Sequence, residues 1–158
     1  MAQADHGRIA ARLAELGVEL PEAAKPIANY VPAVVTGDLL FVSGQVPMRD
    51  GKIAYTGKLG AAVPIEMGQQ AAQLCFINVL AQALAALGTL DRVVRVVRLG
   101  GFVAAGPEFT QHAQVMNGAS DMAVAVFDDA GRHARTTIGV PSLPGDAAVE
   151  VEAVFEIA

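Results

Sequence analysis

The last quarter of the chain, residues 133–157, carries the charged side chains whose types and spacing could do chemistry. We predict two strands there, joined by a Pro- and Gly-rich connection into a hairpin-like unit. Arg135 opens the first strand, and Glu150 and Glu152 alternate with apolar residues in the second. A guanidinium can hold a carboxylate through two parallel hydrogen bonds, and a nearby carboxylate can orient water. The pattern therefore indicates a small-anion site with a water-handling acid beside it.

A purely structural role for these charges is an alternative that the pattern leaves open. Arg135 could lie on the surface or form an ion pair with Glu150 or Glu152. Side chains two residues apart in a strand share a face. The two glutamates could therefore simply form a solvated outer face, with the valines on the opposite one.

The composition favours a single domain that also buries surface against other chains. The 158 residues are 53% hydrophobic and only 17% charged, whereas ordinary domains are roughly 25% charged. One domain of this size cannot hide so much apolar surface alone, so we expect an oligomer. The net charge is −5 and no lysine or arginine cluster occurs, which argues against nucleic-acid binding.

Signals of secretion, membrane insertion and metal binding are missing from the sequence. The single cysteine, Cys75, lies in an apolar helical pattern, so we expect a buried thiol and a reducing, cytoplasmic location. The N-terminus has no apolar signal core, and polar residues interrupt the longest apolar stretch, residues 71–87, so no membrane partner is expected. The three histidines are far apart, and neither metal-ligand spacing nor a glycine-rich phosphate loop occurs.

The periodicity of apolar residues predicts an α+β domain in which helices cover one face of a sheet. Gly44 lies inside a strand and is expected to mark a bulge or a close approach to the backbone. The second long helix is expected to be broken in character around Asn117 and Gly118. The expected elements are a helix over residues 5–16 capped by Gly17, strands over 30–35 and 39–46, a turn at 49–51, a helix over 64–87 closed by Gly88, a strand over 90–103, a helix over 107–127 and the two closing strands.

Three separated stretches resemble one known family and occur in the family's order. They are NYVPAVVTGDLLFVSGQVP at residues 29–47, QQAAQLCFINVLAQALAALG at residues 69–88 and ARTTIGVPSLPGDAAVEVEAVFEI at residues 134–157. The chain is thereby identified as a member of the Rid (reactive intermediate deaminase) family, also called YjgF-like or L-PSP endoribonuclease-like. It resembles a long variant, with residues 1–27 as an N-terminal helical extension and residues 28–158 as the YjgF-like domain.

The resemblance implies a chorismate-mutase-like α+β fold, a mixed sheet with two long helices on one face. It further implies a homotrimeric barrel with ligand clefts at the subunit interfaces. The implied activity is hydrolysis of reactive 2-imino and enamine acids, such as 2-iminopropanoate and 2-iminobutanoate, to 2-keto acids and ammonia. No metal or cofactor takes part, so the implied partners are the small carboxylate ligand and other copies of the chain.

The family's site residues carry over by position. Arg135 matches the arginine that binds the substrate carboxylate, and Glu150 matches the acid that holds the attacking water. Thr137 stands where the family often has a cysteine. The positions near or lining the ligand cleft are matched by Tyr30, Ser43, Gly44 and Asn117.

Two other functions are open from the sequence. A non-catalytic binder or sensor of small 2-keto carboxylates would need the same arginine but no working Glu150. The ribonuclease activity in the older family name is disfavoured by the acidic chain and by the lack of a basic groove or aromatic platform. Individual roles are open as well: His133 could tune the site or cap a surface turn, of which we favour the latter, and Tyr30 and Ser43 could be ordinary core or turn residues.

Overall fold

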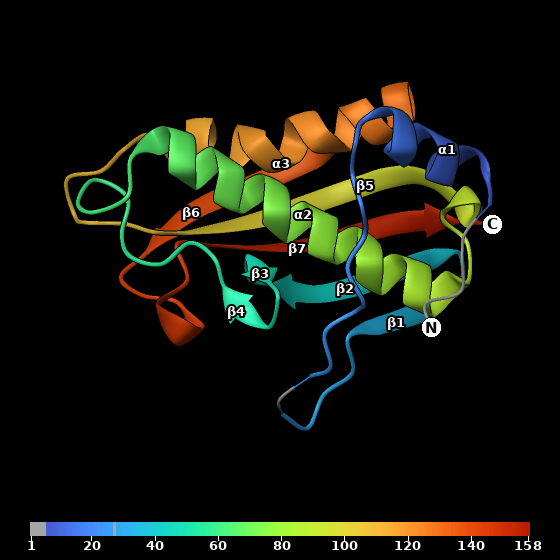
Figure 1. The fold of residues 1–158 in the computed structure, drawn as a ribbon, viewed down its shortest axis with the longest axis horizontal. Helices are drawn as coiled ribbons and strands as arrows, with labels where there is room; N and C mark the ends of the chain where they lie inside the picture. Colours follow the sequence, from blue (N-terminus) through green and yellow to red (C-terminus); the bar gives the residue numbers. More distant parts are fainter. Residues whose placement is uncertain (1–5, 27) are drawn as a thin grey trace.

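A five-stranded mixed sheet forms the centre of the fold, and two long helices cover one of its faces (Figure 1). The computed structural model describes residues 6–26 and 28–158. The strand order is β1-β2-β7-β5-β6, with β5 and β6 parallel and the other neighbours antiparallel. The predicted α+β class, with a mixed sheet and both long helices on one face, is confirmed.

The sheet strands are β1 (Ala33–Thr36), β2 (Leu39–Gln45), β5 (Val93–Ala104), β6 (Ala134–Val140) and β7 (Val149–Ile157). A separate ribbon contains β3 (Met48–Arg49) and β4 (Lys52–Ile53), and the α-helices are α1 (Arg8–Glu15), α2 (Ile65–Leu87) and α3 (His112–Phe127). Short 3₁₀ turns are η1 (Leu90–Arg92), η2 (Asp128–Gly131) and η3 (Pro144–Asp146). Asp5, the predicted start of the first helix, and residue 27, the predicted end of the extension, lie outside the described residues.

Helix α2 packs its apolar surface on α3 and on the sheet. It follows Pro64, whose ring suits the start of a helix, and it ends at Gly88, which adopts the left-handed φ of 80°. By length and composition alone α2 could cross a membrane, but 67% of its apolar window is buried inside the fold, as in a core helix. Phe76 and Cys75 are fully buried on it. The predicted helix and the predicted burial of Cys75 are confirmed.

The two closing strands do not form the predicted hairpin. Strand β6 pairs in parallel with β5, with Arg135 opposite Leu99, whereas β7 pairs antiparallel with both β5 and β2. Every second residue of β7 is buried, so this strand fits the middle of the sheet, while the largely exposed β6 takes the edge. The predicted alternation of Glu150 and Glu152 with buried apolar residues is confirmed.

Helix α3 is continuous through Asn117 and Gly118, so the predicted break is wrong. The helix also begins at His112 instead of residue 107. A Cβ atom on Gly118 would overlap the backbone carbonyl oxygen of Gln69 in α2. The glycine therefore permits the close packing of two helices and does not interrupt either of them.

The segment before β5 differs from the predicted strand and holds the N-terminal helix in place. Residues 90–92 form η1, and β5 starts only at Val93. The Asp91 carboxylate accepts hydrogen bonds of 2.8 Å from the backbone N–H groups of both Ile9 and Arg8, at the start of α1. These bonds lower the pKa of Asp91. Ile9 itself is fully buried, so α1 is anchored both by its cap and by the common core.

Replacing Gly118 with alanine tests the packing of α2 on α3. Alanine normally stabilises a helix relative to glycine by roughly 1 kcal/mol, but here the added methyl group would overlap the Gln69 carbonyl oxygen. We therefore expect Gly118→Ala to lower the free energy of unfolding, measured in urea, by about 1–3 kcal/mol. Asp121→Ala at an exposed position of the same helix is the control and should change it by less than about 0.5 kcal/mol. A stabilised Gly118→Ala protein would contradict the packing argument.

Candidate functional site

Arg135 extends its side chain from the edge strand β6 toward α3. Its Nη1 group donates to Asn117 Oδ1 at 2.9 Å and to Ser120 Oγ at 3.1 Å, and its Nη2 group lies 3.4 Å from the Ala113 carbonyl oxygen. The three helix residues are three or four positions apart, so α3 presents them on one face. The structure thus brings together two predicted site residues, Arg135 and Asn117.

Gly44 makes room for the carboxylate of Glu150. The pairing of β2 with β7 is shifted between Val42 and Gln45, so Gly44 lies in a bulge. A Cβ atom on Gly44 would lie 2.9 Å from Cδ of Glu150. The bulge and the close approach predicted for Gly44 are therefore both present, and a larger residue would push the carboxylate aside.

Ser43 and Tyr30 lie near this bulge, one on β2 and the other in the segment before β1. Ser43 Oγ donates to the Val31 carbonyl oxygen at 2.9 Å and so fixes the chain next to Tyr30. Tyr30 is 53% exposed, so its ring is available to a ligand or to another chain. The structure thus brings Tyr30, Ser43 and Gly44 close together, and of these Gly44 lies directly against Glu150.

The N-terminal connector forms one wall of a cavity of about 140 Å³ beside Tyr30 and Gly44. The buried Gln82 side chain on α2 donates to the Ala24 carbonyl oxygen at 2.7 Å and holds the connector there. A larger hollow of about 690 Å³ lies between the connector, α2 and the β3–β4 ribbon, but none of the predicted site residues line it. We therefore place the candidate site at the smaller cavity and at the Arg135 cluster. The smaller cavity is lined by Ala24, Lys25, Pro26, Tyr30, Pro32, Gly44, Gln45, Val46, Met48 and Gln82.

Arg135 and Glu150 lie on opposite faces of the sheet. Arg135 is paired with the fully buried Leu99 and bonds to α3, so it belongs to the helix-covered face. Glu150 is paired with Phe102 and alternates with the buried residues of β7, so it belongs to the open face. Strand β5 also separates the two strands. One chain cannot bring both side chains to one small ligand, and the residues form two separate half-sites.

Burial raises the pKa of Glu150, and the negative charge of Glu152 on the same strand face raises it further. A carboxyl group whose pKa is shifted toward neutrality is better suited to accept and return a proton than an ordinary surface glutamate. The half-buried Glu150 therefore has the electrostatic character of an acid–base group.

The structural ion pair considered for Arg135 is not formed within the described part of the chain. The arginine that pairs with a β7 glutamate is Arg98, whose Nη1 lies 3.4 Å from Glu152 Oε1. Both side chains are partly exposed, so this pair contributes little to stability. Glu152 thus has a structural partner, whereas Arg135 is held by neutral groups that leave its charge available to an anion.

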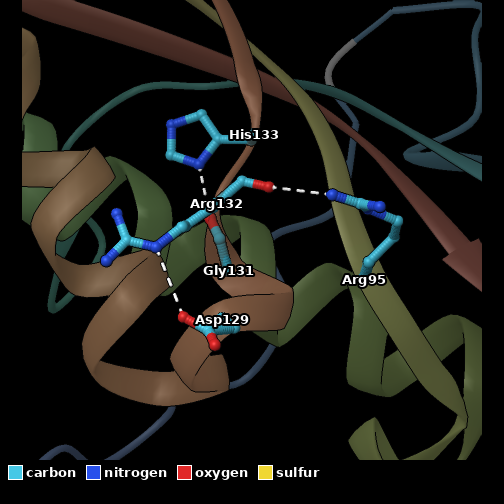
Figure 2. Close-up of polar contacts among 5 residues, drawn as sticks. All are labelled: Arg95, Asp129, Gly131, Arg132 and His133. Carbon is cyan, nitrogen blue, oxygen red and sulfur yellow. Dashed lines mark hydrogen bonds and ion pairs between the residues drawn. The ribbon is translucent and has the colours of Figure 1, made fainter.

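Ser120 contacts Arg135, and His133 contacts Ser120. The sequence did not single out Ser120 and left two roles open for His133. The His133 ring lies between the Gly131 carbonyl oxygen, 2.6 Å from Nδ1, and Ser120 Oγ, 2.8 Å from Nε2 (Figure 2 shows the Gly131 contact). The favoured prediction of a surface cap therefore misses the contact with Ser120. The three-residue spacing between Asn117 and Ser120 on a predicted helix was the signal for Ser120.

Thr137 Oγ1 is buried and has no hydrogen-bond partner among residues 6–26 and 28–158. It lies two residues after Arg135 and therefore on the same face of β6. A buried hydroxyl group without a partner is unfavourable, so a ligand that reaches this face would find an available donor. Within the same residues, no group of three or more His, Cys, Asp or Glu side chains is arranged to hold a metal ion.

Comparisons with known proteins agree with this fold over nearly the whole chain. A family described as "YjgF/chorismate mutase-like, putative endoribonuclease" matches residues 10–157. The chain belongs to this family, and its resemblance to the Rid proteins is confirmed.

Individual relatives span similar lengths. Protein TCP17 from Trypanosoma cruzi is 51% identical over 96% of this chain and 95% of its own length. The crystal structure of Atu1372, a protein of unknown function from Agrobacterium tumefaciens, is 50% identical with a TM-score of 0.89, covering 95% of this chain and 92% of that one. Escherichia coli TdcF, crystallised with bound serine, is 25% identical with a TM-score of 0.61, covering 87% of this chain and 94% of that one.

The raised pKa of Glu150 can be tested by removing its charged neighbour. We expect Glu152→Gln to lower the pKa of Glu150 while leaving it above the ordinary value, because burial, the larger cause, persists. Carboxyl ¹³C NMR titration measures this pKa. Because the folded-state pKa is raised, ionisation of Glu150 lowers stability as pH rises from the unfolded pKa to the folded one, and Glu152→Gln should narrow that interval. Glu156→Gln, farther along the same face, is the control. If it lowers the pKa of Glu150 as much as Glu152→Gln does, the attribution of the shift to Glu152 is contradicted.

Proposed function

We propose that the protein hydrolyses reactive 2-imino and enamine acids, of the 2-iminopropanoate and 2-iminobutanoate type, to 2-keto acids and ammonia. Arg135 binds the substrate carboxylate, and Glu150 orients the attacking water. The observation that carries the proposal is the pair of complementary half-sites, an anion-binding arginine and a raised-pKa carboxyl group, in a member of this family. The serine bound to the relative TdcF supports a small ligand with a carboxylate next to its nitrogen-bearing carbon.

The two half-sites form one complete site when a second copy of the chain supplies one of them. The open face of the sheet carries exposed apolar side chains, Val34 at 49%, Phe41 at 44% and Ile138 at 47%, and a sheet face of this kind calls for cover. A head-to-tail ring places unlike surfaces against each other at every interface. A homotrimeric barrel of this kind would bring the Arg135 side of one copy to the Glu150 side of the next.

The chemistry requires only positioning and proton transfer. Water oxygen attacks the imine carbon while Glu150 accepts a water proton, and this proton passes to the substrate nitrogen. The C–N bond of the resulting carbinolamine then breaks, the hydroxyl proton is transferred through Glu150 to the leaving ammonia, and the 2-keto acid is formed. Arg135 keeps the carboxylate fixed throughout. General acid–base help of this kind contributes roughly 10²–10⁴-fold, which is useful for a substrate that is already reactive.

A non-catalytic role, the binding of small 2-keto carboxylates, uses the same Arg135 half-site and is the second candidate. The net charge of −5 disfavours the ribonuclease named in the family description, because RNA binding relies on positive surface charge. The chain has one cysteine, Cys75, and so no internal disulfide, which supports a cytoplasmic location for either role.

Replacing Arg135 and replacing Glu150 should have different effects on binding and on turnover. Iminopropanoate is generated in the assay by an amino-acid oxidase, and ammonia release is measured. We expect Arg135→Ala to lower kcat/KM by about 100-fold, because charge-assisted hydrogen bonds to the carboxylate are lost. Glu150→Gln should abolish turnover but retain binding of pyruvate, and retained turnover in this variant would refute the role of Glu150. A wild-type protein that binds pyruvate but releases no ammonia would favour the non-catalytic binder. Arg132→Ala, at an exposed arginine paired only with Asp129 among the described residues, is the control and should retain full activity.

Mixed oligomers test whether one site draws on two chains. Arg135→Ala copies still supply Glu150, and Glu150→Gln copies still supply Arg135. Equal co-expression should therefore restore complete sites at about one quarter of the interfaces of a head-to-tail ring. Each variant expressed alone is the control, with no turnover for Glu150→Gln and the roughly 100-fold lower activity for Arg135→Ala. A mixed oligomer that forms but stays inactive would refute the shared site.

A further inference from the structure

A chain of hydrogen bonds runs from Arg135 through Ser120 and His133 to the backbone at Gly131. Arg135 Nη1 lies 3.1 Å from Ser120 Oγ, and Ser120 Oγ lies 2.8 Å from His133 Nε2. His133 Nδ1 in turn lies 2.6 Å from the Gly131 carbonyl oxygen. Neither Ser120 nor His133 takes part in the hydrolysis proposed above, so the chain of bonds requires its own explanation.

With the His133 ring neutral, the groups at the two ends fix the direction of every bond in this chain. A carbonyl oxygen only accepts, so His133 Nδ1 carries a proton, and Nε2 of the neutral imidazole is then an acceptor. Ser120 therefore donates its hydroxyl proton to Nε2. Its oxygen lone pairs remain for the Nη1–H of Arg135. Each donor thus meets one acceptor without conflict.

The backbone end of the chain is held firmly by both the helix and the sheet. A Cβ atom on Gly131 would overlap the Ala123 carbonyl oxygen, so this segment lies directly against α3. Arg95 on β5 donates to the Arg132 carbonyl oxygen at 3.4 Å and ties the segment to the sheet (Figure 2). The Gly131 carbonyl oxygen is therefore a fixed reference point for the His133 ring.

We infer that Ser120 and His133 are positioning residues that hold the Arg135 guanidinium ready for a planar carboxylate, an inference that rests on the proposed function. Asn117 and Ser120 occupy both Nη1 hydrogens. No hydrogen bond from the described residues reaches Nε, and the Ala113 carbonyl oxygen, 3.4 Å from Nη2, engages at most one of the two Nη2 hydrogens. The Nε–H and one Nη2 hydrogen are therefore left for a ligand at this edge of the guanidinium. Two parallel N–H groups on this edge match the two oxygens of one carboxylate. An arginine already ordered in this way loses less side-chain freedom on binding.

NMR spectroscopy tests the inference without relying on any activity. Long-range ¹H–¹⁵N spectra at neutral pH should show His133 mainly as the Nδ1–H tautomer. The Arg135 guanidinium should show separate, slowly exchanging N–H signals that merge in Ser120→Ala. A dominant Nε2–H tautomer, or Arg135 signals unchanged by Ser120→Ala, would overturn the inference.

Kinetics then separate a positioning role from a merely structural one. We expect Ser120→Ala to raise the KM for 2-iminopropanoate about 10-fold with kcat nearly unchanged, because one hydrogen bond that orients the arginine is lost. Ser120→Thr retains a hydroxyl group and should restore KM. His133→Ala should resemble Ser120→Ala, and the double variant should be no worse than either single one, because the two residues act as one unit. A lowered Tm with unchanged KM would show a structural role and contradict the inference.

The controls distinguish failure of this inference from failure of the proposed function. His6→Ala, at an exposed histidine far along the chain, should leave KM and the Arg135 signals unchanged. If the wild-type protein hydrolyses no imino acid, the proposed function fails, and the NMR signals with the Kd for pyruvate still decide the role of Ser120 and His133. If hydrolysis occurs and Ser120→Ala changes neither KM nor the Arg135 signals, only the positioning role is refuted.

Discussion

The placement of β5 between β6 and β7 is the constraint on which the fold and the candidate site both depend. Strand β5 pairs antiparallel with β7 from Val93 to Val103 and in parallel with β6 from Arg98 to Ala104. This pairing fixes which face each side chain occupies, because strand residues alternate between faces. It therefore places Arg135 on the helix-covered face of the sheet and Glu150 on the open face. One chain thus carries two half-sites on opposite faces and no complete site.

Three glycines allow the close contacts that position the two half-sites. Gly118 lets α3 lie against the backbone of α2, Gly131 lets the following turn lie against α3, and Gly44 leaves room for the Glu150 carboxylate. Each contact is between backbone and backbone or between backbone and one functional group. Backbone positions vary less than those of flexible side chains, so the Arg135 and Glu150 half-sites rest on rigid supports.

Local signals in the sequence predicted the elements well, but they did not predict which elements become neighbours. Pro64 and Gly88 mark the ends of α2, and alternation marks the faces of β7, because caps and periodicity act over a few residues. The partner of β6 depends on burial summed over the whole sheet, which no local pattern records. Gly118 shows the same limit: its helix-breaking tendency is local, whereas the α2 contact that requires it lies far along the chain.

The Asp91 cap on α1 has a consequence for the behaviour of the protein in acid. Because its backbone hydrogen bonds lower the pKa of Asp91, the cap stabilises α1 at ordinary pH and is lost as pH falls through that lowered value. The connector that follows α1 forms a wall of the cavity beside Tyr30. Acid therefore weakens the attachment of α1 at its N-terminal end, while the buried Ile9 and the hydrogen bond from Gln82 to the Ala24 carbonyl oxygen still hold the helix and the connector.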